Sequence, residues 1–302
     1  MRPMTATLGA LLLSLSSAVT THAQGVTTQP ELGLGSQLIF YYDAREGFTT
    51  FVNIRNNGNS GNALRVQLDV WGPFFDSQTK VTRIFELPAF QTRVTDIGAL
   101  KTTDGLPAQQ GIVLASVLNE SGSPIQQRAL MGNFTVANLA TGSGWGSPAL
   151  ARSARQLNGT PAPDNTVVNG TTVFYQVIQA DLLALGPYYN PETLAPAAEG
   201  GSQLIFVNFK DNQGELATPS TATTNWTVLA TRGNDGSLLG GPIAVTGVSD
   251  RDLVSLLGAD ANGASGGGGF ARTPTPLDTA NRFIFFVQTL GTFGMGYLLP
   301  NL

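Results

Sequence analysis

The side chains available for chemistry in this chain are carboxylates, hydroxyls, amides, basic groups and aromatic rings, because it has one histidine and no cysteine. His22 lies within the first 23 residues, which have the features of a cleaved leader. A Ser-His-Asp or Cys-His nucleophile system requires an imidazole, and zinc, iron and copper sites mostly use imidazole or thiolate ligands. We therefore expect no catalytic residues of these kinds, no metal site and no cofactor.

Paired carboxylates would support glycoside hydrolysis, which needs two Asp or Glu side chains about 5–10 Å apart and no histidine. The N-terminal half carries five candidates, and their spacing does not show which of them converge: Asp43, Asp69, Asp76, Glu86 and Asp96. The competing interpretation is that these carboxylates are solvated or cap turns. A hydrolase that uses carboxylates alone is the least favoured of the functional hypotheses.

Two segments rich in Asp, Asn and Gly, 211–215 and 260–263, could offer oxygen ligands to calcium. Neither has ligands at alternate positions followed by a terminal Glu, as an EF-hand loop does. We interpret both as turns without metal. The glycines at 266–269 are interpreted as a flexible loop, because no Lys-Ser/Thr follows them as in a phosphate-binding loop.

Aromatic rings offer a third kind of chemistry, since a flat ring can stack on the apolar face of a sugar. The candidates for ligand binding are Trp71, Trp145 and Trp226. The alternative is that these rings fill the core or a seam between domains. Exposed, coplanar rings would support sugar binding, and buried rings would support a scaffold.

Residues 1–23 carry Arg2, an apolar stretch at about 8–19, and the small residues Thr21 and Ala23 at positions −3 and −1 before Gln24. This is the pattern of a cleaved signal peptide, and the apolar stretch is shorter than the ~20 residues of a membrane span. We expect export to the periplasm, the cell surface or the extracellular space, with no transmembrane helix after cleavage. The lack of cysteine favours a bacterial source.

The charge balance bears on the partners. With 16 Lys and Arg against 20 Asp and Glu, the formal net charge is −4, and only 12% of residues are charged. This composition argues against nucleic acid or anionic lipid as a partner. Other surface proteins or glycans are the expected partners.

The composition predicts a mainly β protein, because short apolar segments alternate with turn residues among 36 glycines and 17 prolines. The segment 64–70 shows the pattern best, with apolar and polar residues in strict alternation. Strands are expected at 36–42, 49–55, 64–70, 80–87, 92–97, 111–118, 130–138, 203–209, 225–231, 242–248 and 282–289. Short helical stretches are expected at 147–157, 180–185 and 249–257.

An internal repeat suggests two related units. The segment Gly35–Phe40 (GSQLIF) recurs as Gly201–Phe206, and each copy is followed by a charged turn and then a segment that begins with Thr-Thr. We therefore expect a signal peptide at 1–23, a first sandwich at 24–141, a second at 201–302, and between them a Pro/Gly-rich connection with a short helix at 142–200.

Three segments of the first unit carry a resemblance to a known family: FVNIRNNGNSGNALRVQLDVWG (51–72), FELPAFQTRVTDI (85–97) and GIVLASVLNESGSPIQQRALM (111–131). They resemble the hairpins, the Leu-Pro strand start and the late strand pair of bacterial secreted immunoglobulin-like modules. The resemblance covers about residues 36–138 and implies tandem immunoglobulin-like β-sandwich units. Such modules usually act as scaffolds, adhesins or spacers.

These observations favour an exported, non-enzymatic structural or interaction protein of the bacterial cell surface or periplasm, with a carbohydrate-binding protein as the alternative. Oligomers could form through edge strands, which only three lysines in the chain could guard. The segment 283–287 (FIFFV) is apolar on both faces. It is expected to be a central strand covered on both sides, or else a surface that docks on a partner.

Overall fold

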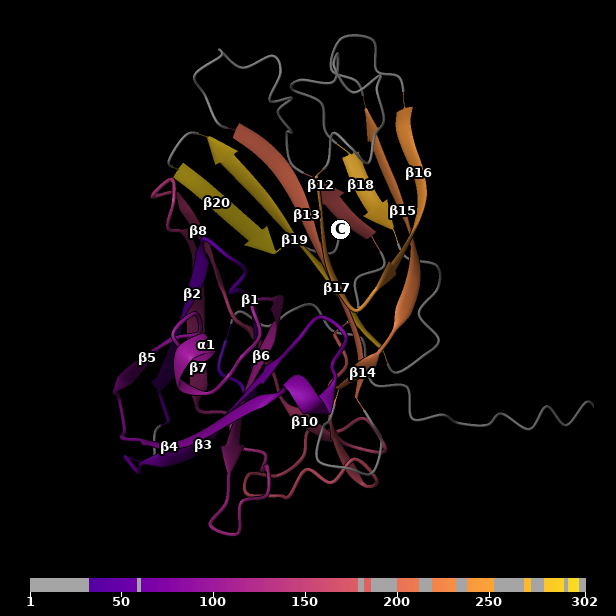
Figure 1. Cartoon of the computed structure of the whole chain (residues 1–302). Coiled ribbons are helices and arrows are strands. Elements are labelled where there is room, and N and C mark those ends of the chain that lie inside the picture. The colour runs from indigo at the N-terminus through magenta and orange to yellow at the C-terminus, as the bar shows by residue number, and fades with distance from the viewer. Residues whose placement is uncertain are drawn as a thin grey trace, which may run out of the picture.

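The computed structural model describes residues 33–58, 61–178, 182–185, 200–211, 219–231, 238–252, 269–272, 280–290 and 293–298. The predicted fold class is confirmed in its coarse form, because the chain is mainly β and consists of several antiparallel sheets (Figure 1). In the described ranges, helix is confined to α1 (Leu100–Thr103) and a single 3-10 turn at Ser77–Thr79.

The strands form four sheets. A five-stranded sheet has the order β4 (Val81–Leu87), β3 (Leu64–Trp71), β6 (Gln110–Leu118), β1 (Gln37–Asp43) and β9 (Leu150–Arg152). A nine-stranded sheet has the order β14 (Pro219–Thr221), β13 (Gly200–Asp211), β19 (Ala280–Leu290), β20 (Phe293–Leu298), β8 (Gly144–Pro148), β7 (Leu130–Asn138), β2 (Phe48–Asn56) and β5 (Thr92–Asp96), and β17 (Val248–Asp252) also pairs with β13. A four-stranded sheet has the order β12 (Leu182–Leu185), β18 (Gly269–Arg272), β15 (Thr223–Thr231) and β16 (Leu238–Thr246), and β10 (Ala154–Gln156) pairs with β11 (Val173–Tyr175).

The nine-stranded sheet joins the two halves of the chain. Strands β5, β2, β7 and β8 come from the first half, and β20, β19, β13, β14 and β17 come from the second. The halves meet where β8 pairs in parallel with β20 at Gly144 and Phe293, whereas all other paired strands are antiparallel. In Figure 1 the sheet can be followed from β2 through β8 and β20 to β19 and β13.

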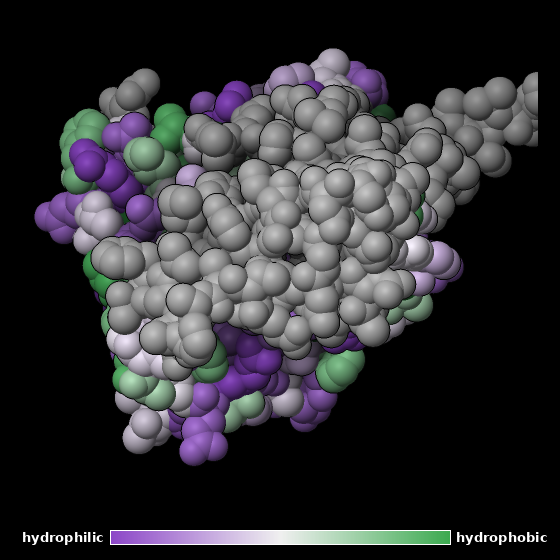
Figure 2. All heavy atoms as spheres, turned by 90° about the horizontal axis from the view of Figure 1, so that it is seen from above, coloured by the Kyte–Doolittle hydropathy of each residue, from purple (hydrophilic) through white to green (hydrophobic). Residues whose placement is uncertain are grey.

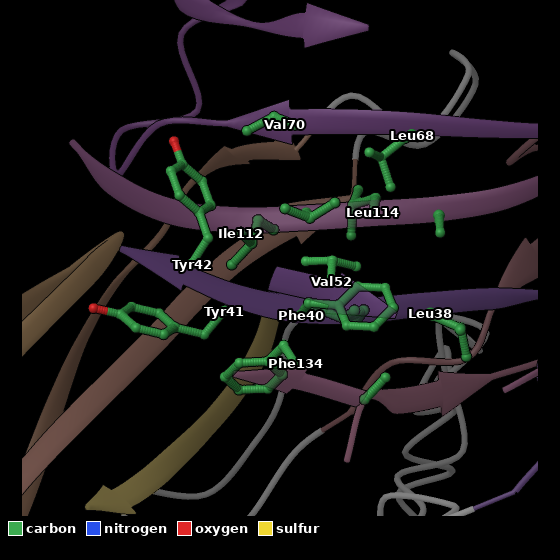
Figure 3. Packing of buried hydrophobic residues seen from close by; sticks show 14 of the residues in the cluster. Leu38, Phe40, Tyr41, Tyr42, Val52, Leu68, Val70, Ile112, Leu114 and Phe134 are labelled. Atoms are coloured by element: carbon green, nitrogen blue, oxygen red, sulfur yellow. The ribbon is translucent and has the colours of Figure 1, made fainter. Parts of the chain in front are cut away.

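Strand β1 is buried on both faces, which explains why its sequence is apolar without alternation. Leu38, Phe40 and Tyr42 lie on one face, and Ile39 and Tyr41 lie on the other, since successive side chains of a strand point to opposite sides. All five side chains are at most 2% exposed. Figure 3 shows the rings of Tyr41 and Tyr42 pointing apart, with Phe40 beside Val52. The five-stranded sheet is therefore an inner layer along β1.

One hydrophobic core runs through both halves. The cluster that contains Val52, Leu68 and Phe134 of the first half also contains Val207 and Phe285 of the second. A ring cluster marks the place where they meet, because Phe285 lies 5.5 Å from Phe134 and 6.4 Å from Tyr41 between ring centroids. The two halves therefore share their apolar burial, and each leaves buried surface uncovered without the other.

The C-terminal apolar segment is a central strand, as predicted. Strand β19 lies between β13 and β20, and the residues 280–287 are all buried. Its neighbour β13 is also buried from 204 to 209. These two strands are covered on both sides, which is why they are nearly continuous in Val, Ile and Phe.

The helix expected at 147–157 is wrong. The structure has β8, β9 and β10 in this region, so the expected connection at 142–200 contains paired strands where it is described. The backbone approach is close, since a Cβ added to Gly146 would lie 2.7 Å from the Phe134 carbonyl oxygen. Pairing with β7 and β1 decides the conformation here, because tertiary contacts override weak helix propensity.

The other two helical predictions are also wrong where they can be compared. Strand β12 lies in the expected helix at 180–185, and β17 covers the start of the one expected at 249–257. Strand β17 follows the register of β13, with Asp250 opposite Ile205. Residues 253–257 lie outside the described residues.

The described residues at the margin of Figure 2 mix hydrophilic and hydrophobic types in small groups, in keeping with a chain of which only 12% of the residues are charged.

Candidate functional site

A cluster of polar side chains lies where β1 and β6 of the first half face β17 of the second. We call Tyr41, Asp43, Arg45, Gln110 and Asp250 the Arg45 cluster. The Arg45 Nη2 atom donates to Asp43 Oδ2 at 2.6 Å and to Asp250 Oδ2 at 2.8 Å. The Gln110 amide donates to Asp250 Oδ1 at 3.1 Å and accepts from the Tyr41 hydroxyl at 3.0 Å. Four of these side chains come from the first half, and Asp250 comes from the second.

The side chains of the Arg45 cluster range from buried to exposed. The Asp43 side chain is 4% exposed, Asp250 is 25% exposed and Arg45 is 41% exposed. Burial raises the pKa of the Tyr41 hydroxyl well above its usual value, and the nearby carboxylates of Asp43 and Asp250 raise it further. The hydrogen bonds that Arg45 donates to the Asp43 carboxylate raise the pKa of the Arg45 guanidinium. Tyr41 therefore stays neutral and Arg45 stays charged at ordinary pH.

Asp43 and Asp250 are the one pair of carboxylates that this region brings within reach of one another, and the sequence did not predict the pairing with Asp250. Both oxygens bind the same guanidinium nitrogen. That nitrogen occupies the position between the carboxylates where a glycosidase would hold a leaving-group oxygen or a water molecule. The geometry is suited to holding an arginine across the junction of the halves.

A second polar cluster, the Arg152 cluster, is buried deeper. It consists of Gln37, Arg152, Asp211 and Asn281. Arg152 donates from Nε to Gln37 Oε1 at 2.6 Å, from Nη1 to Asp211 Oδ2 at 2.6 Å, and from Nη2 to Asp211 Oδ1 at 3.2 Å. Asn281 donates to Asp211 Oδ2 at 3.1 Å. The Arg152 side chain is 0% exposed and that of Asp211 is 19% exposed.

Aromatic faces complete the surroundings of Arg152. Its guanidinium carbon lies 4.9 Å from the ring centroid of Tyr175 and 5.7 Å from that of Phe209. Burial raises the pKa of the Tyr175 hydroxyl to about 12, although the positive charge of Arg152 acts in the opposite direction. A fully buried charge is tolerated only when it is paired and hydrogen-bonded, and this one has both a bidentate carboxylate and a neutral acceptor.

Both clusters connect the halves of the chain. Arg152 and Gln37 belong to the first half, whereas Asp211 and Asn281 belong to β13 and β19. The loop after β3 adds backbone contacts of the same kind, since the Val248 amide donates to the Pro73 carbonyl at 3.1 Å. The charged side chains that reach the interior are thus used to fix one half against the other.

The three tryptophans named as ligand-binding candidates are buried. Trp71 is 1% exposed, Trp145 is 8% exposed and Trp226 is 0% exposed. Trp145 stacks on Tyr41 with 5.7 Å between centroids, and Trp226 packs edge-on against Phe206 at 5.4 Å. The exposed, coplanar rings that a sugar platform requires are not formed by these three residues. The alternative reading, in which the rings fill the core, matches their positions.

The five carboxylates of the N-terminal half are dispersed. Asp69 binds Thr82 and Lys80, Asp76 caps the 3-10 turn through the Gln78 amide, and Asp96 binds the Thr49 hydroxyl. Glu86 is exposed on β4, and Asp43 belongs to the Arg45 cluster. No two of these five share a partner among the contacts of the described residues. Each is held by local contacts or by the junction.

The calcium candidates can be compared only in part. Asp211 is bound to Arg152 and Asn281, and residues 212–215 lie outside the described residues. The segments 260–263 and 266–268 also lie outside them. The carboxylate of Asp211 is thus used by the Arg152 cluster.

Comparison of the chain with models of protein families, with curated proteins and with solved structures finds no match. Across the ranges that the structure describes, none of the helices has the length and apolar character needed to cross a membrane.

Sequence reasoning missed the two junction clusters. A signal was present, because Arg152 interrupts the apolar run Ala149–Ala154, and Asn281 and Arg282 precede FIFFV. A charged residue inside an apolar segment has to find a buried partner. The identity of that partner could not be read from the sequence, because Arg152 and Asp211 come together only where the five-stranded sheet packs against the nine-stranded sheet.

Proposed function

We propose that this chain is an exported, non-enzymatic structural or interaction protein of the bacterial cell surface or periplasm. The observation that carries the proposal is the use made of the reactive side chains. The buried charges Arg152 and Asp43 and the partly exposed Asp211 bind partners across or beside the junction of the halves, and the three tryptophans are buried. Side chains fixed in this way stabilise one rigid body and are poorly placed to turn over a substrate.

We also propose that the chain arose from two related immunoglobulin-like units. The repeated GSQLIF segments support this, since both form strands, β1 and β13. In each copy, the first strand and the segment that begins with Thr-Thr belong to different sheets. Strand β1 is in the five-stranded sheet and β2 in the nine-stranded sheet, whereas β13 is in the nine-stranded sheet and β15 in the four-stranded sheet. Matching sequence and matching change of sheet are what duplication of a sandwich would produce.

Export can be tested directly. The full chain, expressed in a bacterium with its own leader, is expected outside the cytoplasm with an N-terminus at Gln24, read by mass spectrometry of the isolated protein. A matched variant with Ala23→Arg disrupts the small residue at position −1 and should accumulate uncleaved. Cytoplasmic protein that keeps residues 1–23 would contradict the proposal.

The non-enzymatic part needs a separate assay. The purified mature protein is incubated with a panel of polysaccharides, alongside Asp250→Asn, which removes one carboxylate charge of the Arg45 cluster. No release of reducing sugar is expected from either protein. Turnover by the parent that is lost in Asp250→Asn, with an unchanged circular dichroism spectrum, would make Asp43 and Asp250 a catalytic pair and would overturn the proposal.

A further inference from the structure

Strand β5 forms one outer edge of the nine-stranded sheet, and among the described residues it pairs with β2 alone. Its register on β2 runs from Arg55 opposite Thr92 to Phe51 opposite Asp96. At the two ends of β5, Asn56 donates to the Gln91 carbonyl and Ile97 donates to the Thr50 carbonyl. Antiparallel ladders alternate, so Arg93 and Thr95 bond to β2. The N–H and C=O groups of the three residues between them, 92, 94 and 96, point away from β2.

Apolar side chains gather next to this edge. Val94 is 60% exposed, and Phe51 and Met131 on the same outer face are 36% and 42% exposed. Phe90, in the turn that leads into β5, is 56% exposed. Its φ angle is 60°, a conformation that is uncommon for a bulky residue. An exposed edge with apolar neighbours is the usual starting point for strand pairing between chains.

The sequence of β5 is complementary to itself. If a second β5 runs antiparallel with a two-fold axis through Val94, then Val94 lies opposite Val94 of the partner subunit. Thr92 then lies opposite the partner's Asp96, and Arg93 lies opposite the partner's Thr95. This is the one symmetric register that pairs all three outward-directed residues of β5, and it opposes no like charges. An axis through Arg93 or through Asp96 would place two like charges directly opposite, which is destabilising.

Both charged side chains of β5 have partners within the chain. The Arg93 guanidinium lies 4.4 Å from the ring centroid of Phe85 on β4, on the inner side of the sandwich. Asp96 is held by the Thr49 hydroxyl and by the Ala99 amide. The neighbouring edge strand β4 carries two exposed charged residues, Arg83 and Glu86, whereas β5 carries one, Arg93, and exposed charges are a common protection against pairing.

We propose that two copies of this chain associate through β5, in antiparallel register centred on Val94, so that their nine-stranded sheets become one continuous sheet. The proposal rests on the proposed function, because it names the partner of the interaction protein as a second copy of itself. A symmetric pair of this kind is closed, since each copy uses the same edge. Pairing would also bring the two Val94 side chains into contact.

The first test measures mass. The mature protein, residues 24–302, is examined by size-exclusion chromatography with light scattering at increasing concentration, and a dimer is expected. Val94→Lys places two ammonium groups opposite each other and should raise the dissociation constant of the dimer about tenfold or more. Thr135→Lys is the matched control, because Thr135 is exposed on the same outer face but lies two strands from the edge. It should stay dimeric.

The second test uses the absence of cysteine. Val94→Cys introduces one thiol per chain, and across the two-fold axis the Cα atoms would be about 5.5 Å apart, within the range of a disulfide. Mild oxidation should therefore link Val94→Cys into a covalent dimer much faster than Thr92→Cys, whose two thiols would lie four residues apart in register. This variant also keeps the proposal testable if Val94→Lys fails to fold.

The outcomes separate clearly. A monomer at every concentration overturns the proposal, and so does a dimer that Val94→Lys leaves intact. Equal cross-linking of Val94→Cys and Thr92→Cys places the contact elsewhere and also overturns it. None of these results affects the export and turnover assays, so failure of the β5 contact and failure of the proposed function can be told apart.

Discussion

The Arg152 cluster gives the most specific prediction on stability. Replacing Arg152 by Met keeps an unbranched apolar side chain against the ring of Tyr175 but removes the charge and all its hydrogen bonds. Breaking a buried pair by removing one partner costs roughly 3–5 kcal/mol, because the other charge is left without compensation. Since the Asp211 side chain is 19% exposed, water can partly solvate it. We therefore expect about 3 kcal/mol, the lower end of that range.

The reverse replacement should cost more. Asp211→Asn leaves the Arg152 guanidinium charged while its side chain is 0% exposed, so water cannot compensate for the lost partner. We expect about 4–5 kcal/mol for this variant. The double variant Arg152→Met with Asp211→Asn contains no unpaired charge, and it should be more stable than Asp211→Asn alone. The two single effects are then strongly non-additive.

The assay is urea unfolding, followed by tryptophan fluorescence and by far-ultraviolet circular dichroism. Arg65→Met is the matched control, because Arg65 makes an exposed hydrogen bond to the Glu120 carbonyl, and it should change stability by less than about 1 kcal/mol. A destabilisation of Arg152→Met no larger than that of Arg65→Met would refute the reasoning. So would a double variant that loses the sum of the two single effects.

Three further outcomes follow from the same packing. Gly247 has φ 63°, and an added Cβ would lie 2.0 Å from the Pro73 carbonyl oxygen. Gly247→Ala should therefore lower the free energy of unfolding in urea by about 2 kcal/mol or more. Gly241 has open space around it, so Gly241→Ala should not. Because the two halves share a core, they should unfold together. Variants that keep only Trp145 or only Trp226 as a fluorescent reporter should each show one unfolding transition, at the same urea concentration by fluorescence and by circular dichroism. Two unfolding transitions in one variant would show that the halves unfold separately. Burial raises the pKa of Tyr175 to about 12, from about 10 in the unfolded chain, so between these pH values the native state keeps a proton that the unfolded state loses. The contribution of Tyr175 to the free energy of unfolding is therefore constant below pH 10 and falls between pH 10 and 12. In urea titrations, Tyr175→Phe should reduce the fall in stability over this pH range.

Most strands could be predicted from local pattern. Strand β3 is an example, because Leu64, Val66 and Leu68 alternate with polar residues, and the alternation reports a buried face directly. The buried strand β19 could be recognised in a similar way from FIFFV, which is apolar on both sides. These features are properties of single segments, and neighbouring segments do not alter them.

The pairing of strands could not be predicted, and the errors follow from that. Residues 147–157 carry Ala, Arg and Leu, which favour helix, yet β8, β9 and β10 form here because they pair with β7, β1 and β11, respectively. The Arg152 cluster depends on contacts between distant residues, since Arg152 binds both Gln37 and Asn281. The tryptophans illustrate the same limit, because sequence alone does not tell a buried ring from an exposed one.

The contact between Tyr41 and Phe285 has a consequence for the time order of folding. The chain is synthesised from its N-terminus, so β1 emerges long before β19, whose Phe285 ring packs against Tyr41. Until the last strands arrive, Ile39 and Tyr41 present apolar surface to solvent and to other chains. Folding that waits for such distant contacts is slow. The chain therefore passes through a half-assembled stage with exposed apolar surface, on which holdase chaperones have a natural point of action.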